Sequence, residues 1–235
     1  MSCQPAGRIA DNVARVRNRM AEVARANGRS PDEVRLIGVT KYVDSLTAGC
    51  LVDAGVRDVG ESRPRVLREK RQALTDRDVA WHLIGSLQRN KVARTLPVAD
   101  LIHSVDSLRL AAAIGQQAAG EGATQDVLLQ VNISGESAKH GFQPATLIET
   151  LPDLLELPGL RICGWMGMAG LNRNETDTRN QFAELRELRE GCASLASDRH
   201  PLNELSMGMS GDYLWAIAEG ATMVRIGSLL FEGSR

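Results

Sequence analysis

The sequence lacks the features that would place it in a membrane, on a nucleic acid or outside the cell. No apolar run approaches the ~20 residues that a membrane-spanning helix needs. The N-terminal stretch MSCQPAGRIADNVARVRNRM has no apolar core of the secretory type. The formal net charge is -1 at pH 7, with no block of either sign. We therefore expect no nucleic-acid or membrane-surface partner.

Cysteine is scarce and scattered. The four cysteines are Cys3, Cys50, Cys163 and Cys192, and they form no CxxC pair and have no histidine cluster beside them. This pattern argues against a disulfide framework and against a zinc site, so a metal-free protein of the reducing cytoplasm is expected. The composition is otherwise that of an ordinary globular protein, with 43% hydrophobic and 24% charged residues in 235 positions. No linker, low-complexity tract or internal repeat divides the chain, so we expect one domain, 1–235.

Short apolar runs alternate with amphipathic or alanine-rich runs along the chain. The first segment has the helical spacing of apolar residues, at Ile9, Val13, Val16, Met20 and Val23. The clearest later helix, 175–196, carries one apolar stripe, formed by Phe182, Leu185, Leu188, Cys192 and Leu195. The runs that favour strands are residues 34–40, 57–60, 80–85, 101–105, 127–133, 160–168, 203–208 and 222–227.

The alternation of strands and helices predicts a parallel sheet covered by helices. Eight strands in this length match an α/β fold of the (β/α)₈ TIM-barrel type. An open doubly wound sheet is the alternative, but it would require a GxGxxG motif after an early strand, and none occurs there.

In such a barrel the active face lies at the carboxyl ends of the strands. Small and polar residues gather at those ends, and the ordinary preferences of turns explain most of them. Turn preference does not explain Lys41, directly after the apolar run LIGVT, or Arg225, near the end of the last predicted strand.

The lysine inventory singles out one position. The chain has only Lys41, Lys70, Lys91 and Lys139. We expect Lys70 on a solvated helix face, Lys91 at the start of a helix and Lys139 in a polar loop, so Lys41 alone follows a buried strand. Unlike arginine, a lysine can lose its proton when its surroundings favour it, and it can then form a Schiff base with a carbonyl.

Two motifs follow the last two predicted strands: SMGMSGD, 206–212, and VRIGSLLF, 224–231. The loops at these places in a barrel commonly bind phosphate, often where a short helix begins. A Schiff-base lysine with a phosphate site fits pyridoxal 5'-phosphate (PLP), and it also fits a PLP-free aldolase acting on a sugar phosphate. Arg225 can donate a hydrogen bond to a pyridine nitrogen without protonating it, or form a salt bridge at the barrel rim.

At these motifs the sequence resembles the YggS/PROSC family of PLP-binding proteins, the PLP homeostasis proteins. The resemblance covers nearly the whole chain and rests on seven motifs in order. These are VTK at 39–41, GES at 60–62, WHLIGSLQRNK at 81–91, VNISGESAKHG at 131–141, GWMGM at 164–168, LSMGMSGD at 205–212 and GATMVRIGSLLF at 220–231.

The resemblance implies a PLP-bearing barrel of fold type III, similar to the barrel domain of alanine racemase, with an extra N-terminal helix. It implies that Lys41 is the Schiff-base lysine, that Arg225 faces the pyridine nitrogen and that Met166 lines the pocket. The phosphate loop would contain Ser206, Met207, Gly208, Ser210, Gly227 and Ser228. Two departures from the family pattern stand out: Ser62 in place of the usual asparagine near the cofactor ring, and Glu232 before Gly233 in the closing turn.

The family role implied is the binding and handling of PLP in homeostasis, without efficient catalysis. A PLP-dependent amino-acid racemase or lyase is the alternative. Racemisation needs a second acid/base on the opposite face of the substrate, which in racemases is a tyrosine from an additional C-terminal domain. This chain ends at Arg235, and its two tyrosines are Tyr42 and Tyr213. The expected partners are PLP and, transiently, apo PLP enzymes. No predicted helix shows a second apolar stripe, so a monomer is expected.

Overall fold

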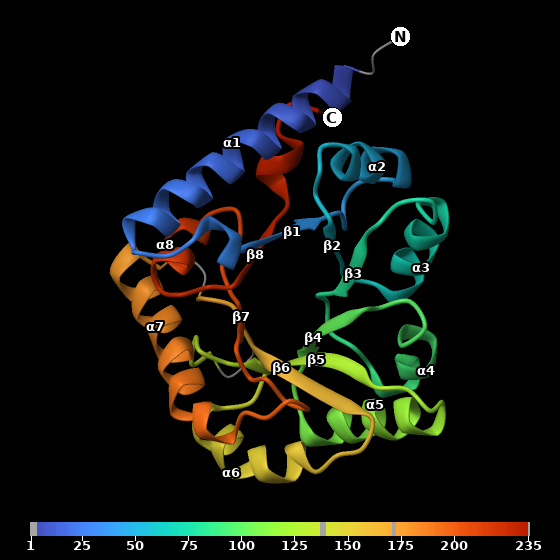
Figure 1. The fold of residues 1–235 in the computed structure, drawn as a ribbon, viewed down its shortest axis with the longest axis vertical. Coiled ribbons are helices and arrows are strands. Elements are labelled where there is room, and N and C mark those ends of the chain that lie inside the picture. The colour runs from blue at the N-terminus through green and yellow to red at the C-terminus, as the bar shows by residue number, and fades with distance from the viewer. Residues whose placement is uncertain (1–3, 137–139, 171–172, 235) are drawn as a thin grey trace.

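The computed structural model, which describes residues 4–136, 140–170 and 173–234, is a closed parallel barrel surrounded by helices (Figure 1). Each strand pairs in parallel with its sequence neighbours, and β1 pairs with β8 to close the ring. The strands are β1 Arg35–Val39, β2 Asp58–Glu61, β3 Ala80–Leu83, β4 Leu101–Val105, β5 Gln125–Val131, β6 Leu160–Gly167, β7 Glu204–Ser206 and β8 Met223–Ile226. The predicted (β/α)₈ barrel is thus confirmed, and the open sheet is excluded.

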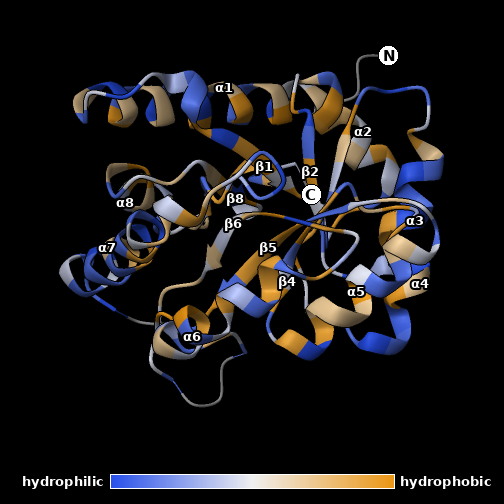
Figure 2. Cartoon of the chain, turned by 60° about the horizontal axis from the view of Figure 1, so that its bottom comes forward, coloured by the Kyte–Doolittle hydropathy of each residue, from blue (hydrophilic) through white to orange (hydrophobic). Residues whose placement is uncertain are grey.

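Helices follow the strands around the outside of the barrel. They are α1 Gln4–Ala26, α2 Ser45–Asp53, α3 Pro64–Ala73, α4 Val92–Thr95, α5 Leu108–Gly120, α6 Pro144–Leu155, α7 Glu175–Gly191 and α8 Tyr213–Ala218. Short 3₁₀ helices are η1 Pro31–Glu33, η2 Arg89–Lys91, η3 Ala193–Leu195 and η4 Ser228–Phe231. Figure 2 shows hydrophobic and hydrophilic residues alternating along these helices, as expected for elements that cover a sheet on one face and meet water on the other.

The additional helix α1 packs on the outside of the barrel, beside α2, α8 and η4 (Figure 1). Its predicted apolar stripe is buried from Ile9 to Met20. The amide of Asn12 donates to the carbonyl oxygens of Leu230 and Glu232, at 3.3 and 3.0 Å. These bonds join the first helix to the last segment of the chain.

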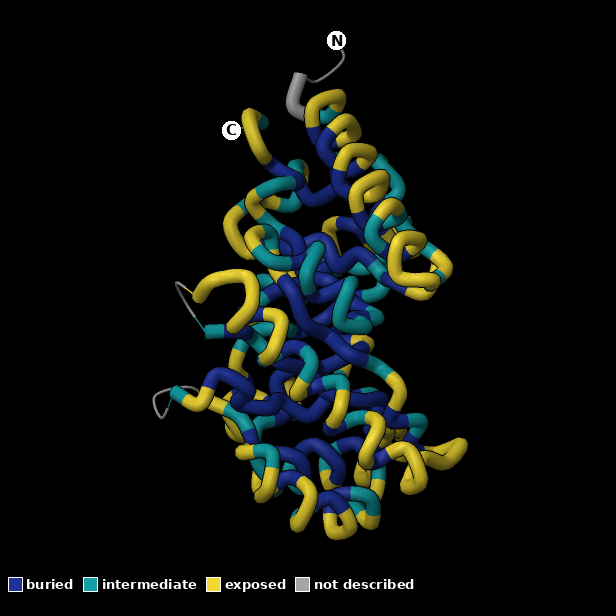
Figure 3. Tube along the Cα trace, turned by 90° about the vertical axis from the view of Figure 1, so that its left-hand side faces the viewer, coloured by how far each residue is buried: buried dark blue, intermediate teal, exposed yellow. Residues whose placement is uncertain are grey.

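Apolar side chains form two separate clusters. The larger one fills the layer between the strands and the helices. Figure 3 shows that buried residues run through the middle of the molecule, with exposed residues at its periphery. The smaller one lies inside the barrel and consists of Ile37, Leu101, Leu128, Cys163, Met166 and Met223. Buried polar side chains, among them Ser206 and Arg225, also lie in the described interior, and buried polar groups need hydrogen-bond partners.

One residue of the predicted stripe on α7 departs from the pattern. Phe182, Leu185, Leu188 and Cys192 are buried, but Leu195 is 46% exposed. The reason is local, because α7 ends at Gly191 and Leu195 falls in the separate 3₁₀ turn η3, where the helical period no longer applies. Within the described residues, no helix is long and apolar enough to cross a membrane.

Candidate functional site

Lys41 stands in the turn that leaves the barrel at the end of β1. Thr40 is fully buried, and its backbone N–H donates to the carbonyl of Gly60 at 3.0 Å, so it extends the sheet by one residue. Lys41 follows it and is exposed. The helix α2 begins shortly after, and the carboxylate of Asp44 accepts the N–H of Thr47 at 2.8 Å as its N-cap. The predicted strand, turn and helix therefore place the Lys41 amine at the barrel mouth.

The Lys41 amine lies 5.0 Å from the centre of the Tyr42 ring, a cation–π distance. No carboxylate of the described residues lies within ion-pair distance of this amine. Tyr42 is itself 75% exposed. The turn thus presents an amine next to an aromatic ring, with no acidic partner in the described part of the chain.

Lys70 lies directly behind this turn, and its predicted place on a solvated helix face is wrong. Its side chain is 3% exposed, and its amine donates to Glu61 Oε2 at 2.6 Å and to the carbonyl oxygen of Thr40 at 2.7 Å. The reason is the register of α3, in which Lys70 shares the buried face with Leu67 and the following Leu74. A buried lysine is tolerated because the carboxylate and the carbonyl compensate its charge and its donors.

Glu61 accepts hydrogen bonds from both Lys70 and Ser62, the serine that replaces the usual asparagine of the family. Its side chain is 1% exposed and its Oε1 accepts the backbone N–H of Ser62 at 2.8 Å and the Ser62 hydroxyl at 3.4 Å. Its Oε2 accepts the Thr40 hydroxyl at 3.4 Å in addition to Lys70. Glu61 therefore ties the ends of β1 and β2 together, and Ser62 turns its hydroxyl toward Glu61.

The loop after β7 has a fixed shape. Gly208 has a φ of 89°, and a Cβ there would lie 2.5 Å from the Cβ of Ala216, so only glycine fits. The Met209 N–H donates to the carboxylate of Asp212 at 2.5 Å. Burial raises the pKa of Asp212. Met207 is fully buried in the cluster outside the barrel, so only its backbone faces the loop.

A hydrogen bond joins the loops after β7 and β8. The N–H of Gly227 donates to the Ser210 hydroxyl at 3.2 Å. A Cβ on Gly227 would meet the Cβ and the carbonyl oxygen of Val39 at 3.4 and 3.5 Å, which puts this loop beside the end of β1. Ser228 is exposed and begins the short helix η4, as predicted. The structure thus brings Ser210, Gly227 and Ser228 together next to the turn of Lys41.

Ser206 and Arg225 belong to the barrel interior. Ser206 is fully buried and Arg225 is 5% exposed. Arg225 donates to the Ser206 hydroxyl at 2.6 Å and to the carbonyl of Gly167 at 2.9 Å. Burial lowers the pKa of Arg225 to about 10, so the guanidinium stays charged at neutral pH. These contacts make Arg225 an interior donor rather than a rim salt bridge.

From Ser206 a chain of hydrogen bonds crosses the barrel, which sequence reasoning missed. His103 Nδ1 lies 2.9 Å from Ser206 Oγ, His103 Nε2 lies 2.9 Å from His82 Nδ1, and His82 Nε2 lies 3.0 Å from Asp58 Oδ1. Both histidines are almost fully buried. The available signal was a histidine inside each of two apolar strands, with Trp81 and Leu83 around His82 and with Ile102 before His103.

The direction of every proton in this chain follows from its two ends. An ionised Asp58 only accepts, so His82 donates to it from Nε2 and, when neutral, accepts at Nδ1. His103 must then donate from Nε2 and accept at Nδ1, so Ser206 donates to His103 while it accepts from Arg225. Burial lowers the pKa of His103 well below its usual value, with smaller contributions from His82 and Arg225, in agreement with a neutral His103. The chain holds the Arg225 side chain in one orientation.

The remaining predicted residues lie in different parts of the molecule. Met166 is buried in the interior cluster, with the partly buried Met168 packed against it. Lys91 is exposed at the end of η2, and Tyr213 is buried on α8 in the outer cluster. Lys139 lies outside the described residues. Of the two tyrosines, Tyr42 alone stands near the Lys41 amine.

Comparison with known proteins places these features in a family. The family model of the alanine racemase N-terminal domain matches residues 6–235. The pyridoxal phosphate homeostasis protein of Aquifex aeolicus is 38% identical over 221 residues, covering 94% of this chain and 96% of that protein. The pyridoxal phosphate homeostasis protein of Escherichia coli K12 is 36% identical over 226 residues, covering 95% of each chain.

Solved structures agree with this assignment. PipY of Synechococcus elongatus, solved with PLP bound, has a TM-score of 0.82 and 35% identity, covering 95% of this chain and 99% of that one. Alanine racemase of Clostridium difficile, at 17% identity and a TM-score of 0.72, covers 94% of this chain and 55% of its own, and this likeness shows the fold. The chain belongs to the alanine racemase N-terminal domain family, among its pyridoxal phosphate homeostasis proteins.

Proposed function

We propose that this protein binds PLP covalently through Lys41 and passes it on, as a PLP homeostasis protein without efficient catalysis. The observation that carries the proposal is the exposed Lys41 amine, which has no acidic partner among the described residues and stands beside the loops after β7 and β8. The names of the relatives and the PLP-bound PipY structure support the same cofactor.

The residues present fit each part of PLP. The aldehyde requires an amine, which Lys41 supplies. A pyridine nitrogen requires a donor, and Arg225 has five N–H groups, of which the hydrogen bonds to Ser206 and Gly167 use two. The phosphate requires hydroxyl and backbone donors, which the loops containing Ser210, Gly227 and Ser228 provide. When bound, PLP supplies a reactive aldehyde conjugated to an electron-accepting ring.

The role proposed for Ser206 changes in this arrangement. Its hydroxyl already donates to His103 and accepts from Arg225, so it orients Arg225 rather than the phosphate. Gly208 shapes the loop after β7 through its positive φ. The Met207 side chain is buried in the larger cluster, so only its backbone can contribute to a phosphate site. The proposed phosphate site is therefore centred on Ser210, Gly227 and Ser228.

Arg225 limits what the bound cofactor can do. With a pKa of about 10, its guanidinium donates a hydrogen bond at neutral pH but does not hand over its proton. A pyridine nitrogen held by Arg225 would stay unprotonated, and the ring would then withdraw electrons only weakly. A positioned second acid/base typically contributes a factor of ~10²–10⁴ in rate, and Tyr42, the one tyrosine near Lys41, is 75% exposed and packs on the amine. These features support holding PLP rather than amino-acid turnover.

The proposed partners follow from a reversible covalent bond. An amine that releases PLP by hydrolysis or by exchange with another amine can supply an apo PLP enzyme during a transient encounter. The exposed large apolar residues on the described surface are Tyr42, Leu46, Ile148, Leu195 and Met209. Because they lie on four separate stretches of the chain, we propose that the protein acts as a monomer.

The test combines loading, transfer and turnover. The PLP-loaded protein is mixed with an apo PLP enzyme and recovered activity is followed; separately, it is incubated with L- and D-alanine or serine and chirality is followed. We expect transfer, with racemisation near background. The variant Gly227→Asp places a carboxylate at the proposed phosphate site and should retain PLP poorly, while Leu195→Asp serves as an exposed control. Turnover at ~1–10³ per second would contradict the proposal and favour the racemase.

A further inference from the structure

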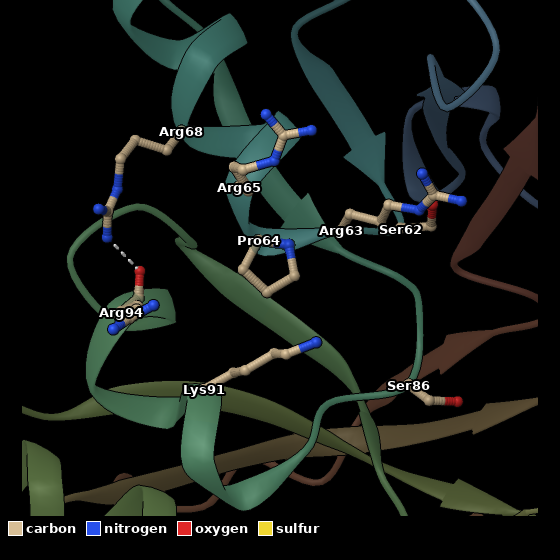
Figure 4. A pocket seen from close by; sticks show the side chains of 8 residues that line it. All are labelled: Ser62, Arg63, Pro64, Arg65, Arg68, Ser86, Lys91 and Arg94. Carbon is tan, nitrogen blue, oxygen red and sulfur yellow. Dashed lines mark hydrogen bonds between the residues drawn. The ribbon is translucent and has the colours of Figure 1, made fainter.

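A pocket of about 650 Å³ opens beside the ends of β2 and β3 (Figure 4). Ser62 follows β2 and Ser86 follows β3, so the pocket borders the carboxyl edge of the barrel. The two loops are in close contact there, since a Cβ on Gly85 would lie 2.2 Å from the Ser62 carbonyl oxygen. A volume of this size is in the range of ~300–1,000 Å³ typical of small-molecule sites.

Basic side chains dominate this pocket. Among its eight lining residues are Arg63, Arg65, Arg68, Lys91 and Arg94, and none is acidic. Figure 4 shows α3 on one side of the pocket and the η2–α4 segment on the other, with the Lys91 side chain extending into the space between them. The whole chain has a formal net charge of -1, so this cluster does not reflect a generally basic composition.

The charges of the pocket are largely uncompensated. Arg65 pairs with Glu69 at 2.8 Å, but both side chains are more than half exposed, so water screens the pair. Arg68 donates to the carbonyl of Arg94 at 2.6 Å. Arg63, Lys91 and Arg94 have no carboxylate within ion-pair distance in the part of the chain that the structure describes. Like charges held together in this way favour an anion between them.

The chemistry of the lining favours a phosphate monoester. Its terminal oxygens and its charge of about −2 at pH 7 suit several cations at once, and guanidinium groups match phosphate geometry. Ser86, which also lines the pocket, adds a neutral hydroxyl donor. A nucleic acid would also be expected to use aromatic side chains for base stacking, and the pocket has no aromatic residue.

The pocket lies beside the turn that contains Lys41, and this position indicates its role. In the closed ring, β1 lies between β8 and β2. The proposed phosphate loops after β7 and β8 are on one side of the Lys41 turn, and the basic pocket after β2 and β3 is on the other. We propose that this pocket is a second, noncovalent site for a phosphate monoester, which holds PLP as it arrives at or leaves the Lys41 site. This role rests on the proposed function.

The experiment first occupies the covalent site. The protein is loaded with PLP and reduced with borohydride, and peptide mapping checks that Lys41 carries the label. The reduced protein is then titrated calorimetrically with pyridoxine 5'-phosphate, which has the phosphate but no aldehyde. We expect one further equivalent to bind, more weakly as salt increases. Pyridoxine without phosphate should not bind. Inorganic phosphate and AMP distinguish recognition of PLP-like cargo from recognition of any phosphate.

Two double variants, one in the pocket and one as a control, each remove two positive charges. Lys91→Gln/Arg94→Gln removes two pocket cations and should weaken binding about tenfold or more, while Arg19→Gln/Arg25→Gln, on the exposed face of α1, should leave it unchanged. Equal affinity in both double variants, or no binding to the reduced protein, would overturn the second site. If mapping finds no label on Lys41, the proposed covalent site fails, and titration of the unreduced protein still tests the pocket.

Discussion

Lys41 and Lys70 meet at the same turn, yet their surroundings are opposite. Lys70 is buried, donates to Glu61 and binds the carbonyl of Thr40, the residue before Lys41. Lys41 is exposed, and its amine faces the Tyr42 ring without an ion-pair partner among the described residues. Of these two lysines, Lys70 fixes the backbone and Lys41 is left available for reaction. The surroundings of a lysine amine therefore determine whether it serves as a structural ion-pair partner or is accessible to react.

The largest expected effect is the loss of covalent PLP when Lys41 is replaced. Lys41→Arg keeps the positive charge but removes the amine that can attach to an aldehyde, so covalent PLP should be lost completely. Because the side chain is exposed, we expect the free energy of unfolding to change by no more than ~0.5 kcal/mol. Visible absorption after loading, and peptide mapping after borohydride reduction, measure the first effect. A covalent label found on Lys91 in the unaltered protein would contradict the assignment.

Lys70 should behave in the opposite way, with a large effect on stability. Lys70→Met leaves the Glu61 carboxylate buried without its cation, and breaking a buried pair in this manner typically costs ~3–5 kcal/mol. The double variant Glu61→Gln/Lys70→Met removes both charges and should recover much of that loss. Urea unfolding measures both, with the exposed Arg65→Met on the same helix as control. A double variant as unstable as Lys70→Met would show that the ion pair is not the cause.

The smallest effect concerns a buried group that must stay neutral. The pKa of His103 is lowered in the folded protein, so on acidification the unfolded chain takes up a proton near its ordinary pKa of ~6.5 and the folded chain does not. Folding stability should therefore be full above that pH and fall below it, by at most ~1.4 kcal/mol per pH unit from this residue.

The measurement is urea unfolding at pH 7 and pH 5. Between pH 7 and pH 5, His103→Gln should lose less unfolding free energy than the unaltered protein. Part of the pH dependence should remain, because burial also lowers the pKa of His200. His140→Gln, at an exposed position, serves as control. An unchanged pH dependence in His103→Gln would show that His103 already titrates in the folded state.

The sequence by itself determined the order of strands and helices, the closed barrel, and the position of Lys41 at a strand end. These follow from local patterns, because the period of apolar residues and the turn residues between the runs need no knowledge of distant contacts. Strand ends were predictable to within a few residues, as for β4, which matches the predicted 101–105. The motifs after β7 and β8 likewise placed the loops that meet at Gly227 and Ser210.

Only the tertiary structure decided which polar residues turn inward and which partners they find. The sequence predicts Lys70 as a surface charge, whereas in the structure it is buried against Glu61 at the end of β2. The chain from Arg225 to Asp58 unites residues from β2, β3, β4, β7 and β8, and Ser206, which the sequence placed in the predicted phosphate loop, is also a link in that chain. Such contacts join residues far apart in sequence, and their energies depend on burial and on hydrogen-bond geometry, which no local period encodes.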